Sequence, residues 1–174
     1  DGDQLTFSIT EGADIVATVA GSDLTFGAPL NFNGSESFTV SVTDGEYIDS
    51  QIMTVSVTPA NDAPVATTGL SAITNEDQGV VISLSGSDID GDNLSFSLSS
   101  DATNGSVTLD GSFATYTPNQ DFNGSDSFIF SISDGSLSDE ASVTLTIDPV
   151  NDAPVLASVS DVSFDEDGSG STSL

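Results

Sequence analysis

The chain has no lysine, arginine, histidine, cysteine or tryptophan among its 174 residues. Its 28 Asp and Glu residues therefore have no side-chain cation to neutralise them, and the formal net charge at pH 7 is -28. Nucleic acids and anionic membranes are bound through clustered Lys and Arg, so we expect neither as a partner. Without cysteine there are no disulfides, no thiolate metal sites and no cysteine nucleophiles.

The same absences leave little chemistry for catalysis. Without His, Cys or Lys, the remaining options are a carboxylate pair of the glycosidase type or an unactivated serine hydroxyl. The most suggestive carboxylates occupy repeated positions, whereas catalytic carboxylate pairs work by having different environments. We therefore expect that the chain is not an enzyme.

Long apolar runs are also missing, although hydrophobic residues make up 36% of the chain. That content is enough for a core, and no run approaches the roughly 20 residues that span a bilayer. A compact body with this charge repels itself unless high ionic strength screens it or bound cations offset it. Divalent metal ions are the economical source of such cations.

The sequence repeats with a period of about 90 residues. The motif Asn-Asp-Ala-Pro-Val begins at Asn61 and again at Asn151 (151 minus 61 is 90). Three further matches are 32–38 with 122–128, 75–77 with 165–167, and 1–9 with 90–98, the last at an offset of 89. This pattern predicts a repeat lacking its first strands at 1–60, a complete repeat at 61–150, and the first strands of a third at 151–174. We expect a loop between Ile9 and Phe32 to absorb the one-residue length change.

Within 61–150, apolar residues alternate with polar ones in short runs flanked by turn formers. The predicted strands lie near 70–73, 80–84, 94–98, 107–109, 113–117, 128–132 and 143–147. No stretch has helical periodicity. About seven short strands are typical of an immunoglobulin-like sandwich, so the predicted fold is all-β, with tandem seven-stranded Greek-key sandwiches in an elongated array.

One segment has the composition of a cation-binding loop. Asp88, Asp90 and Asp92 alternate around a flexible glycine, which lets several hard oxygens converge on one ion, and the ion implied is Ca²⁺. An EF-hand is excluded, because the twelfth position counted from Asp88 is Ser99 instead of Glu. The alternative is an ordinary solvated turn, since Asp-Gly pairs are common turn formers. Further oxygens from Asp148, Asn151 and Asp152 at the joint favour the metal site.

The string Asp148-Pro149-Val150-Asn151-Asp152-Ala153-Pro154 resembles the inter-domain linker of cadherins. Glu76, the Asp88 and Asp90 pair, and Asp134 also resemble cadherin calcium-binding positions. The combination is most similar to the cadherin-like tandem repeats of large secreted bacterial proteins, which include calcium-dependent adhesins. This resemblance implies secretion and calcium in the joints.

The resemblance assigns ligands to two joints. For the joint after the first repeat they are Asn61, Asp62, Asp88, Asp90 and Asp134; for the next joint they are Glu76, Asp148, Asn151 and Asp152. Thr58 stands where the second linker has Asp148, and the cadherin Asp-Arg-Glu motif is absent, with Asp121 as a candidate substitute.

The expected function is a calcium-stiffened spacer or adhesive rod segment of an extracellular protein, secreted or on the cell surface. Its expected partners are neighbouring repeats, of the same or an adjacent chain, and a cell-surface or glycan target. One alternative is a carbohydrate- or cell-surface-binding module. A second is a head-to-tail filament in which the tail of one chain supplies strands to the head of the next. That alternative arises because 151–174 corresponds to 61–84 while residue 1 corresponds to 90, a pattern that we also expect if the chain is a window of a longer tandem array.

Overall fold

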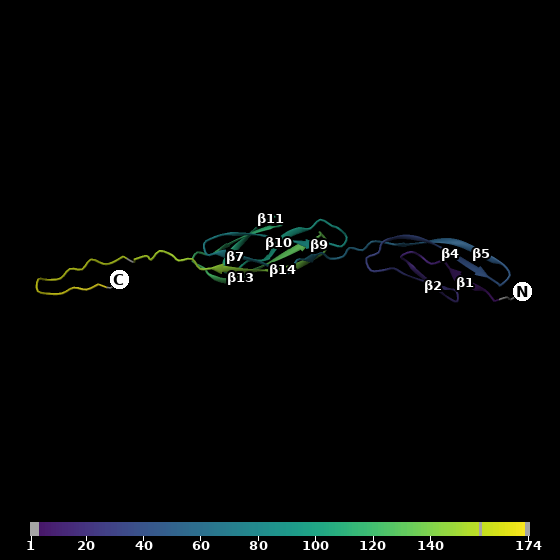
Figure 1. The fold of residues 1–174 in the computed structure, drawn as a ribbon, viewed down its shortest axis with the longest axis horizontal. Helices are drawn as coiled ribbons and strands as arrows, with labels where there is room; N and C mark the ends of the chain where they lie inside the picture. The colour runs from purple at the N-terminus through teal and green to yellow at the C-terminus, as the bar shows by residue number, and fades with distance from the viewer. Residues whose placement is uncertain (1–3, 157, 173–174) are drawn as a thin grey trace. The chain divides into compact units, whose positions relative to one another are not determined.

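The computed structural model describes residues 4–156 and 158–172. The first three residues of the repeat match at 1–9 lie outside this range, as do residues 157, 173 and 174 of the predicted third repeat. Every regular element among the described residues is a β-strand, so no helix in them could cross a membrane (Figure 1). The chain forms two compact units, Asp1–Asp62 (unit 1) and Ala63–Leu174 (unit 2).

The described residues of unit 1 form five strands in two sheets. They are β1 (Thr6–Ile9), β2 (Val16–Ala20), β3 (Asp23–Gly27), β4 (Gly34–Thr43) and β5 (Ile48–Val57). One sheet has the order β1-β4-β5, and β2 pairs with β3 in the other. Ile15 and Phe38 are the buried hydrophobic residues among those described in this unit, and the Phe38 ring lies 5.4 Å from that of Phe26.

The part of unit 2 that the structure describes has nine strands. They are β6 (Val65–Ala66), β7 (Leu70–Asn75), β8 (Val80–Ser83), β9 (Gly86–Ser87), β10 (Ser95–Ser100), β11 (Gly105–Asp110), β12 (Phe113–Pro118), β13 (Gly124–Ser133) and β14 (Ser138–Asp148). The main sheets have the orders β10-β13-β14-β7 and β11-β12-β8, and β6 pairs with β9. All pairs are antiparallel except β14 with β7, which is parallel.

The strands form because their apolar side chains alternate. In β14, the residues Ala141, Val143, Leu145 and Ile147 are buried while the residues between them are exposed. Their side chains pack with those of Phe128, Phe130 and Ile132 from β13, and with Val107, Ala114 and Tyr116 from the other main sheet. A period of two places one row of side chains in the core, so unit 2 is a two-layer sandwich.

The all-β sandwich is confirmed, and each of the seven predicted strand positions holds a strand. We expected a loop to absorb the one-residue length difference between the two repeats. The structure corrects this expectation, because the extra residue lies in a strand. In β10, Leu98 pairs with Phe130 and Ser100 with Ile129, which leaves Ser99 as a β-bulge. In unit 1, Ile9 pairs with Val40, and Thr10 bonds directly to Thr39. The equivalent strand has no bulge there.

Candidate metal centre

The three aspartates between β9 and β10 converge as the sequence predicted. Asp88, Asp90 and Asp92 each offer a carboxylate oxygen within 4.8 Å of the others. The backbone amides of Asp90 and Asp92 both donate to Asp88 Oδ1, at 2.8 and 3.3 Å. Gly91 has a φ of 80°, which only glycine adopts at no steric cost, so it lets the loop fold around Asp88.

The second oxygen of Asp88 shows what this loop is suited to bind. Asp88 Oδ2 is buried and has no hydrogen-bond partner among the described residues. A buried carboxylate oxygen without a donor is costly, and a hard cation is one way to satisfy it. Carboxylate oxygens are also the ligands that Ca²⁺ prefers, so this loop fits the ion.

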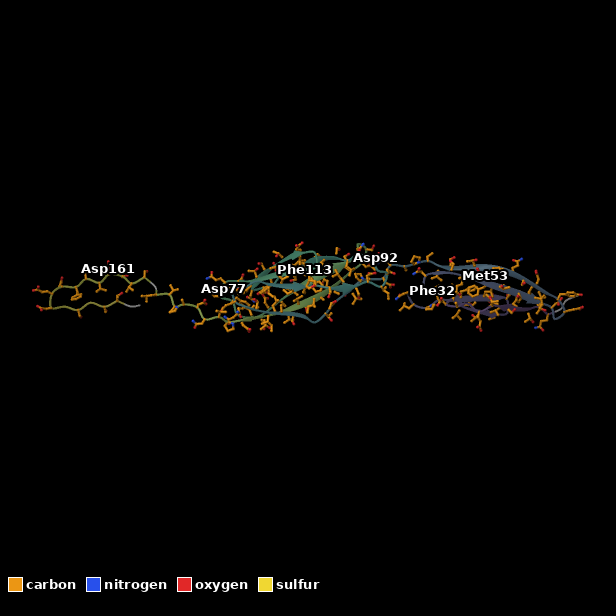
Figure 2. The ribbon with its side chains drawn as sticks, turned by 45° about the horizontal axis from the view of Figure 1, so that its top comes forward. Phe32, Met53, Asp77, Asp92, Phe113 and Asp161 are labelled. Atoms are coloured by element: carbon orange, nitrogen blue, oxygen red, sulfur yellow. The ribbon has the colours of Figure 1, made fainter. Side chains whose placement is uncertain are left out.

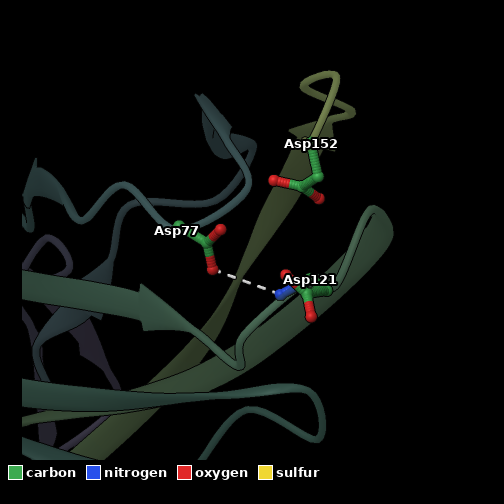
Figure 3. Close-up of side chains that lie close together, drawn as sticks. All are labelled: Asp77, Asp121 and Asp152. Atoms are coloured by element: carbon green, nitrogen blue, oxygen red, sulfur yellow. Dashed lines mark hydrogen bonds between the residues drawn. The ribbon is translucent and has the colours of Figure 1, made fainter. Parts of the chain in front are cut away.

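A second group of carboxylates lies at the other end of unit 2, where β7 and β14 end. Asp77, Asp121 and Asp152 come within 4.8 Å of one another (Figure 3). Asp77 and Asp121 both have positive φ, 61° and 58°, and the Asp121 amide donates to Asp77 Oδ1 at 3.1 Å. Two tight turns therefore present their carboxylates towards Asp152. Figure 2 labels Asp77 and Asp92, which mark the two ends.

Glu76 holds the segment that carries Asp152. Its side chain is buried, with Oε1 accepting from the Val150 amide and Oε2 from Asn123 Nδ2 at 3.3 Å. Its own amide donates to the backbone oxygen of Asp148 at 2.9 Å. Both oxygens thus have protein donors, and the visible role of Glu76 is to fix the chain from 148 to 150 beside the carboxylates.

The electrostatics of this group favour a cation. Desolvation by neighbouring groups raises the pKa of Asp152 although its side chain is exposed, and the negative charges of Asp121, Glu76 and Asp77 raise it further. A raised pKa means that this environment disfavours the ionised form of the Asp152 carboxyl group. No Lys, Arg or His exists in the chain to relieve this repulsion, and a bound divalent ion would do so.

The two Asn-Asp pairs adopt the same local structure. Asn61 Nδ2 donates to the backbone oxygen of Asp62 at 3.0 Å, and Asn151 Nδ2 donates to that of Asp152 at 3.1 Å. The same side-chain-to-backbone hydrogen bond therefore forms at both positions. Asp62 ends unit 1, whereas Asp88 and Asp90 lie in unit 2. The joint predicted from Asn61, Asp62, Asp88 and Asp90 stays a prediction.

Asp134 has a structural role in the turn between β13 and β14. Its Oδ1 accepts from the amides of Ser136 and Leu137 at 2.6 and 2.7 Å. Asp44 does the same in unit 1, where the amides of Tyr47 and Glu46 lower its pKa. The assignment of Asp134 as a metal ligand stays a prediction, and so does that of Asp148, whose backbone takes part in the β7–β14 ladder.

The ligand sets that the resemblance assigned omitted Asp77 and Asp92 and named Asp121 only as a substitute, although the loop composition had already grouped Asp92 with Asp88 and Asp90. A signal for Asp77 was present, since Asn75-Glu76-Asp77 is repeated as Asp165-Glu166-Asp167. Asp92 lies in the same alternating run as Asp88 and Asp90. Asp121 had no signal of its own, because only the folded chain brings its loop next to the β7–β8 turn.

Residues 61–146 match a family model described as "Bacterial Ig domain". A comparison of the sequence with curated proteins finds no match. Domains of this fold are commonly extracellular and typically non-catalytic.

Among solved structures, human protocadherin-24 EC1-2 is 18% identical with a TM-score of 0.57, over 87% of this chain and 84% of that one. A second crystal form has 16% identity and a TM-score of 0.55, over 87% and 83%. An endo-fucoidan hydrolase of glycoside hydrolase family 107 has 22% identity and a TM-score of 0.44, over 86% of this chain and 24% of that one. This chain thus spans about a quarter of the hydrolase. The fold of this chain is an immunoglobulin/cadherin-like β-sandwich.

Proposed function

We propose that the chain is a non-enzymatic spacer or adhesive segment of a secreted or cell-surface protein, and that Ca²⁺ stiffens it. The observation that carries the proposal is that two clusters of three aspartates lie at the two ends of unit 2. Asp88, Asp90 and Asp92 would hold one ion, and Asp77, Asp121 and Asp152 another. Bound there, calcium neutralises the converging charges and holds the flanking segments in place.

Calcium suits these groups better than other common metals. Zinc sites use His and Cys, which the chain lacks. Magnesium demands near-ideal octahedral geometry and gives up its waters reluctantly, whereas Ca²⁺ accepts six to eight oxygens in flexible arrangements. Extracellular modules commonly bind calcium with Kd of about 10⁻⁴ to 10⁻³ M, so the sites would fill outside cells.

The test is thermal unfolding in EDTA and in 10 mM CaCl₂, with NaCl added to the EDTA sample to match ionic strength. With Kd in that range, each site that binds only the folded state adds about 1.4 to 2.7 kcal/mol. Magnesium chloride serves as a second control. If the midpoint of thermal unfolding in CaCl₂ equals the midpoints in NaCl and in MgCl₂, the proposal is overturned.

A matched pair of variants assigns the effect to the site. Asp77→Asn with Asp121→Asn removes two charges from the cluster, and Asp23→Asn with Asp110→Asn removes two from exposed positions elsewhere. Calorimetric titration should show one class of calcium site lost in the first variant and none in the second. Small-angle scattering of the same samples tests stiffening. The glycan-binding alternative stays a prediction that a glycan array would test.

A further inference from the structure

One face of unit 2 carries almost no charge, although the chain has 28 acidic residues. It is the outward side of the sheet β10-β13-β14-β7, whose strands are labelled in Figure 1. Five facing pairs project from β13 and β14 on this side: Ser125–Thr146, Ser127–Thr144, Ile129–Ser142, Ser131–Glu140 and Ser133–Ser138. Eight of these ten residues are Ser or Thr, and Glu140 alone among them is charged. We call these ten residues the hydroxyl face.

The other acidic residues of β13 and β14 do not lie in the hydroxyl face. Asp126 accepts from the Asn104 amide on the inward side, and Asp139 accepts from the Ala66 amide there. Asp148 is the last residue of β14, beyond the five pairs. Glu140 itself accepts from the hydroxyl of Ser99 in β10 at 2.5 Å. Repulsion between carboxylates is therefore weak across this face.

Unit 1 has an equivalent of the hydroxyl face on β4 and β5. Its five outward pairs, 90 residues earlier, are Ser35–Ser56, Ser37–Thr54, Thr39–Ile52, Ser41–Ser50 and Thr43–Ile48. None of these ten residues is charged. The hydroxyl oxygens of Ser35 and Ser56 lie 2.8 Å apart, so facing hydroxyls bond to each other. The same uncharged surface thus recurs in both units.

Like charge decides which surface two copies of this chain can share. Each copy has a formal charge of -28 and no side-chain cation, so a contact between acidic loops adds repulsion without any compensating ion pair. The hydroxyl face avoids that cost. Ser and Thr hydroxyls donate as well as accept, so a layer of hydroxyls can satisfy an identical layer. A second copy is therefore the partner whose chemistry matches this face.

The middle pair of the face shows how two copies fit. Ile129 is in the middle pair of unit 2, as Ile52 is in unit 1, and these side chains are 37% and 75% exposed. A two-fold axis across the strands at this pair places Ile129 opposite Ile129 of the second copy and reverses the order of the other pairs. Glu140 then faces Thr144 of the second copy, whose hydroxyl can donate to it. Apolar groups meet each other, and the one carboxylate meets a donor.

We propose that the hydroxyl face of one copy docks against the hydroxyl face of a second copy about this two-fold axis. The contact is isologous, so it closes as a pair of faces. Strands β13 and β14 have 10 and 11 residues, and β10 and β7 each flank part of them. The face therefore measures about 34 by 15 Å, or about 500 Å² per copy. A total of about 1,000 Å² is typical of weak, reversible contacts. The contact needs no metal and so goes beyond the proposed function.

Sedimentation in EDTA measures this association. Screening shortens the reach of the repulsion from about 30 Å at 0.01 M NaCl to about 3 Å at 1 M, so the association constant should rise at least about tenfold over that range. At 1 M NaCl, Ile52→Lys with Ile129→Lys should lower it at least about tenfold, because each lysine faces its own copy. A chain that stays monomeric at every salt concentration would overturn the proposal.

The matched control is Thr18→Lys with Thr108→Lys. These two residues are also 90 apart and exposed, but they lie on β2 and β11, in the other sheets. The control changes the net charge by the same amount, so it should associate at least as well as the original chain. Circular dichroism checks that both variants are folded. Equal loss in the control contradicts the proposal.

Crosslinking tests the two-fold arrangement, and it is clean because the chain has no cysteine. Ser142 is in the middle pair, so the proposal places Ser142 of the two copies opposite each other. A bismaleimide that bridges about 10 Å, the spacing of stacked sheets, should join Ser142→Cys chains into covalent dimers in EDTA and 1 M NaCl.

Ser125→Cys is the control on the same face. Ser125 is exposed but lies two pairs from the middle, so the reversed order puts the two copies of this residue about 27 Å apart. Its crosslinking should be at least about tenfold lower. A mixture of Ser125→Cys and Ser133→Cys chains should crosslink, because these positions face each other across the axis. Equal crosslinking of Ser142→Cys and Ser125→Cys, or none in either, would overturn the proposal.

Discussion

At the scale of residues, one carboxylate in each unit anchors a loop to the sheet. Asp126 accepts from the amides of Thr103 and Asn104 at 3.1 and 2.8 Å. Glu36 stands 90 residues earlier and accepts from the amides of residues 13–15 at 2.8 to 3.3 Å. Sequence alone could not single out these two among 28 acidic residues, because the role depends on a loop 21 to 23 residues away.

Replacing Asp126 should cost unit 2 about 3 kcal/mol. Its carboxylate also accepts from the Tyr116 hydroxyl at 3.0 Å, so Asp126→Ala leaves that buried hydroxyl with only the 3.4 Å contact to the Asn104 oxygen and removes the acceptor of two amides. Tyr116→Phe removes only the hydroxyl and should cost about 1 kcal/mol. Asp110→Ala, at an exposed turn, is the control and should cost less than about 0.5 kcal/mol. Urea unfolding measures all three by circular dichroism, and equal costs at Asp126 and Asp110 would contradict this role.

The hydrogen-bonded pair of Asp126 and Tyr116 makes the free energy of unfolding depend on pH in both the acid and the alkaline range. Burial disfavours the Asp126 carboxylate, but the amides of Asn104, Ser127 and Thr103 and the Tyr116 hydroxyl outweigh it and lower the pKa of Asp126 below 3.8. The unfolded state then binds more protons, so this contribution is present above pH 3.8 and is lost as pH falls through the lowered pKa. Burial, together with Asp126, raises the pKa of Tyr116 from 10.0, so the folded state holds that proton longer and stability falls as pH rises above 10.

The other carboxylates also titrate, and their protonation relieves charge repulsion. Comparing the original chain with a variant at each pH cancels that shared effect and leaves the contribution of Asp126 or Tyr116. The difference in unfolding free energy between the original chain and Asp126→Asn should be constant from pH 5 to 8 and shrink below pH 3.8. The difference from Tyr116→Phe should likewise shrink above pH 10. Urea titrations across pH 2.5 to 11 measure both, and a difference that does not change with pH would contradict the linkage.

At the scale of elements, alternation predicted the strands but not where the ladder is interrupted. The long strands β13 and β14 have an unbroken period of two, which specifies the face that each residue presents. Strands β6 and β9 have two residues each, which is too few to show an alternation of apolar and polar residues. The bulge at Ser99 was missed for another reason: Ser99 and Ser100 are identical, so the repeat comparison cannot tell which residue is extra.

Deleting Ser99 tests the bulge as the source of the length change. The deletion gives β10 the uninterrupted register that Thr6–Ile9 has with β4, so we expect a loss below about 1 kcal/mol. Deleting Ser97 instead moves Leu98, which packs on the core, to the outward face, and should cost about 2 kcal/mol or more. Urea unfolding of the two deletions measures the difference. Equal costs would place the length change elsewhere.

At the scale of the whole molecule, charge sets the conditions under which the chain is stable. The composition of the chain predicted that cations are required. Spacing alone predicted that the carboxylates of Asp88 and Asp90 converge in one loop. It could not assemble the second cluster, since Asp77, Asp121 and Asp152 come from three separate turns and segments. Local spacing is visible in a sequence, whereas convergence across a sandwich depends on how the strands pair.

Monovalent salt should stabilise this chain, because it has no side-chain cations and therefore no side-chain ion pairs for salt to weaken. All interactions between its ionised side chains are repulsive, and screening shortens their reach from about 30 Å at 0.01 M to about 10 Å at 0.1 M. In EDTA at pH 7, the midpoint of thermal unfolding should rise by about 4 °C or more between 10 and 500 mM NaCl, which corresponds to ~1 kcal/mol. At pH 3, where most carboxylates are protonated, the same salt series should give a much smaller rise. Circular dichroism measures both series. A midpoint that falls with salt at pH 7 would show that attractive interactions outweigh the repulsion of 28 acidic groups.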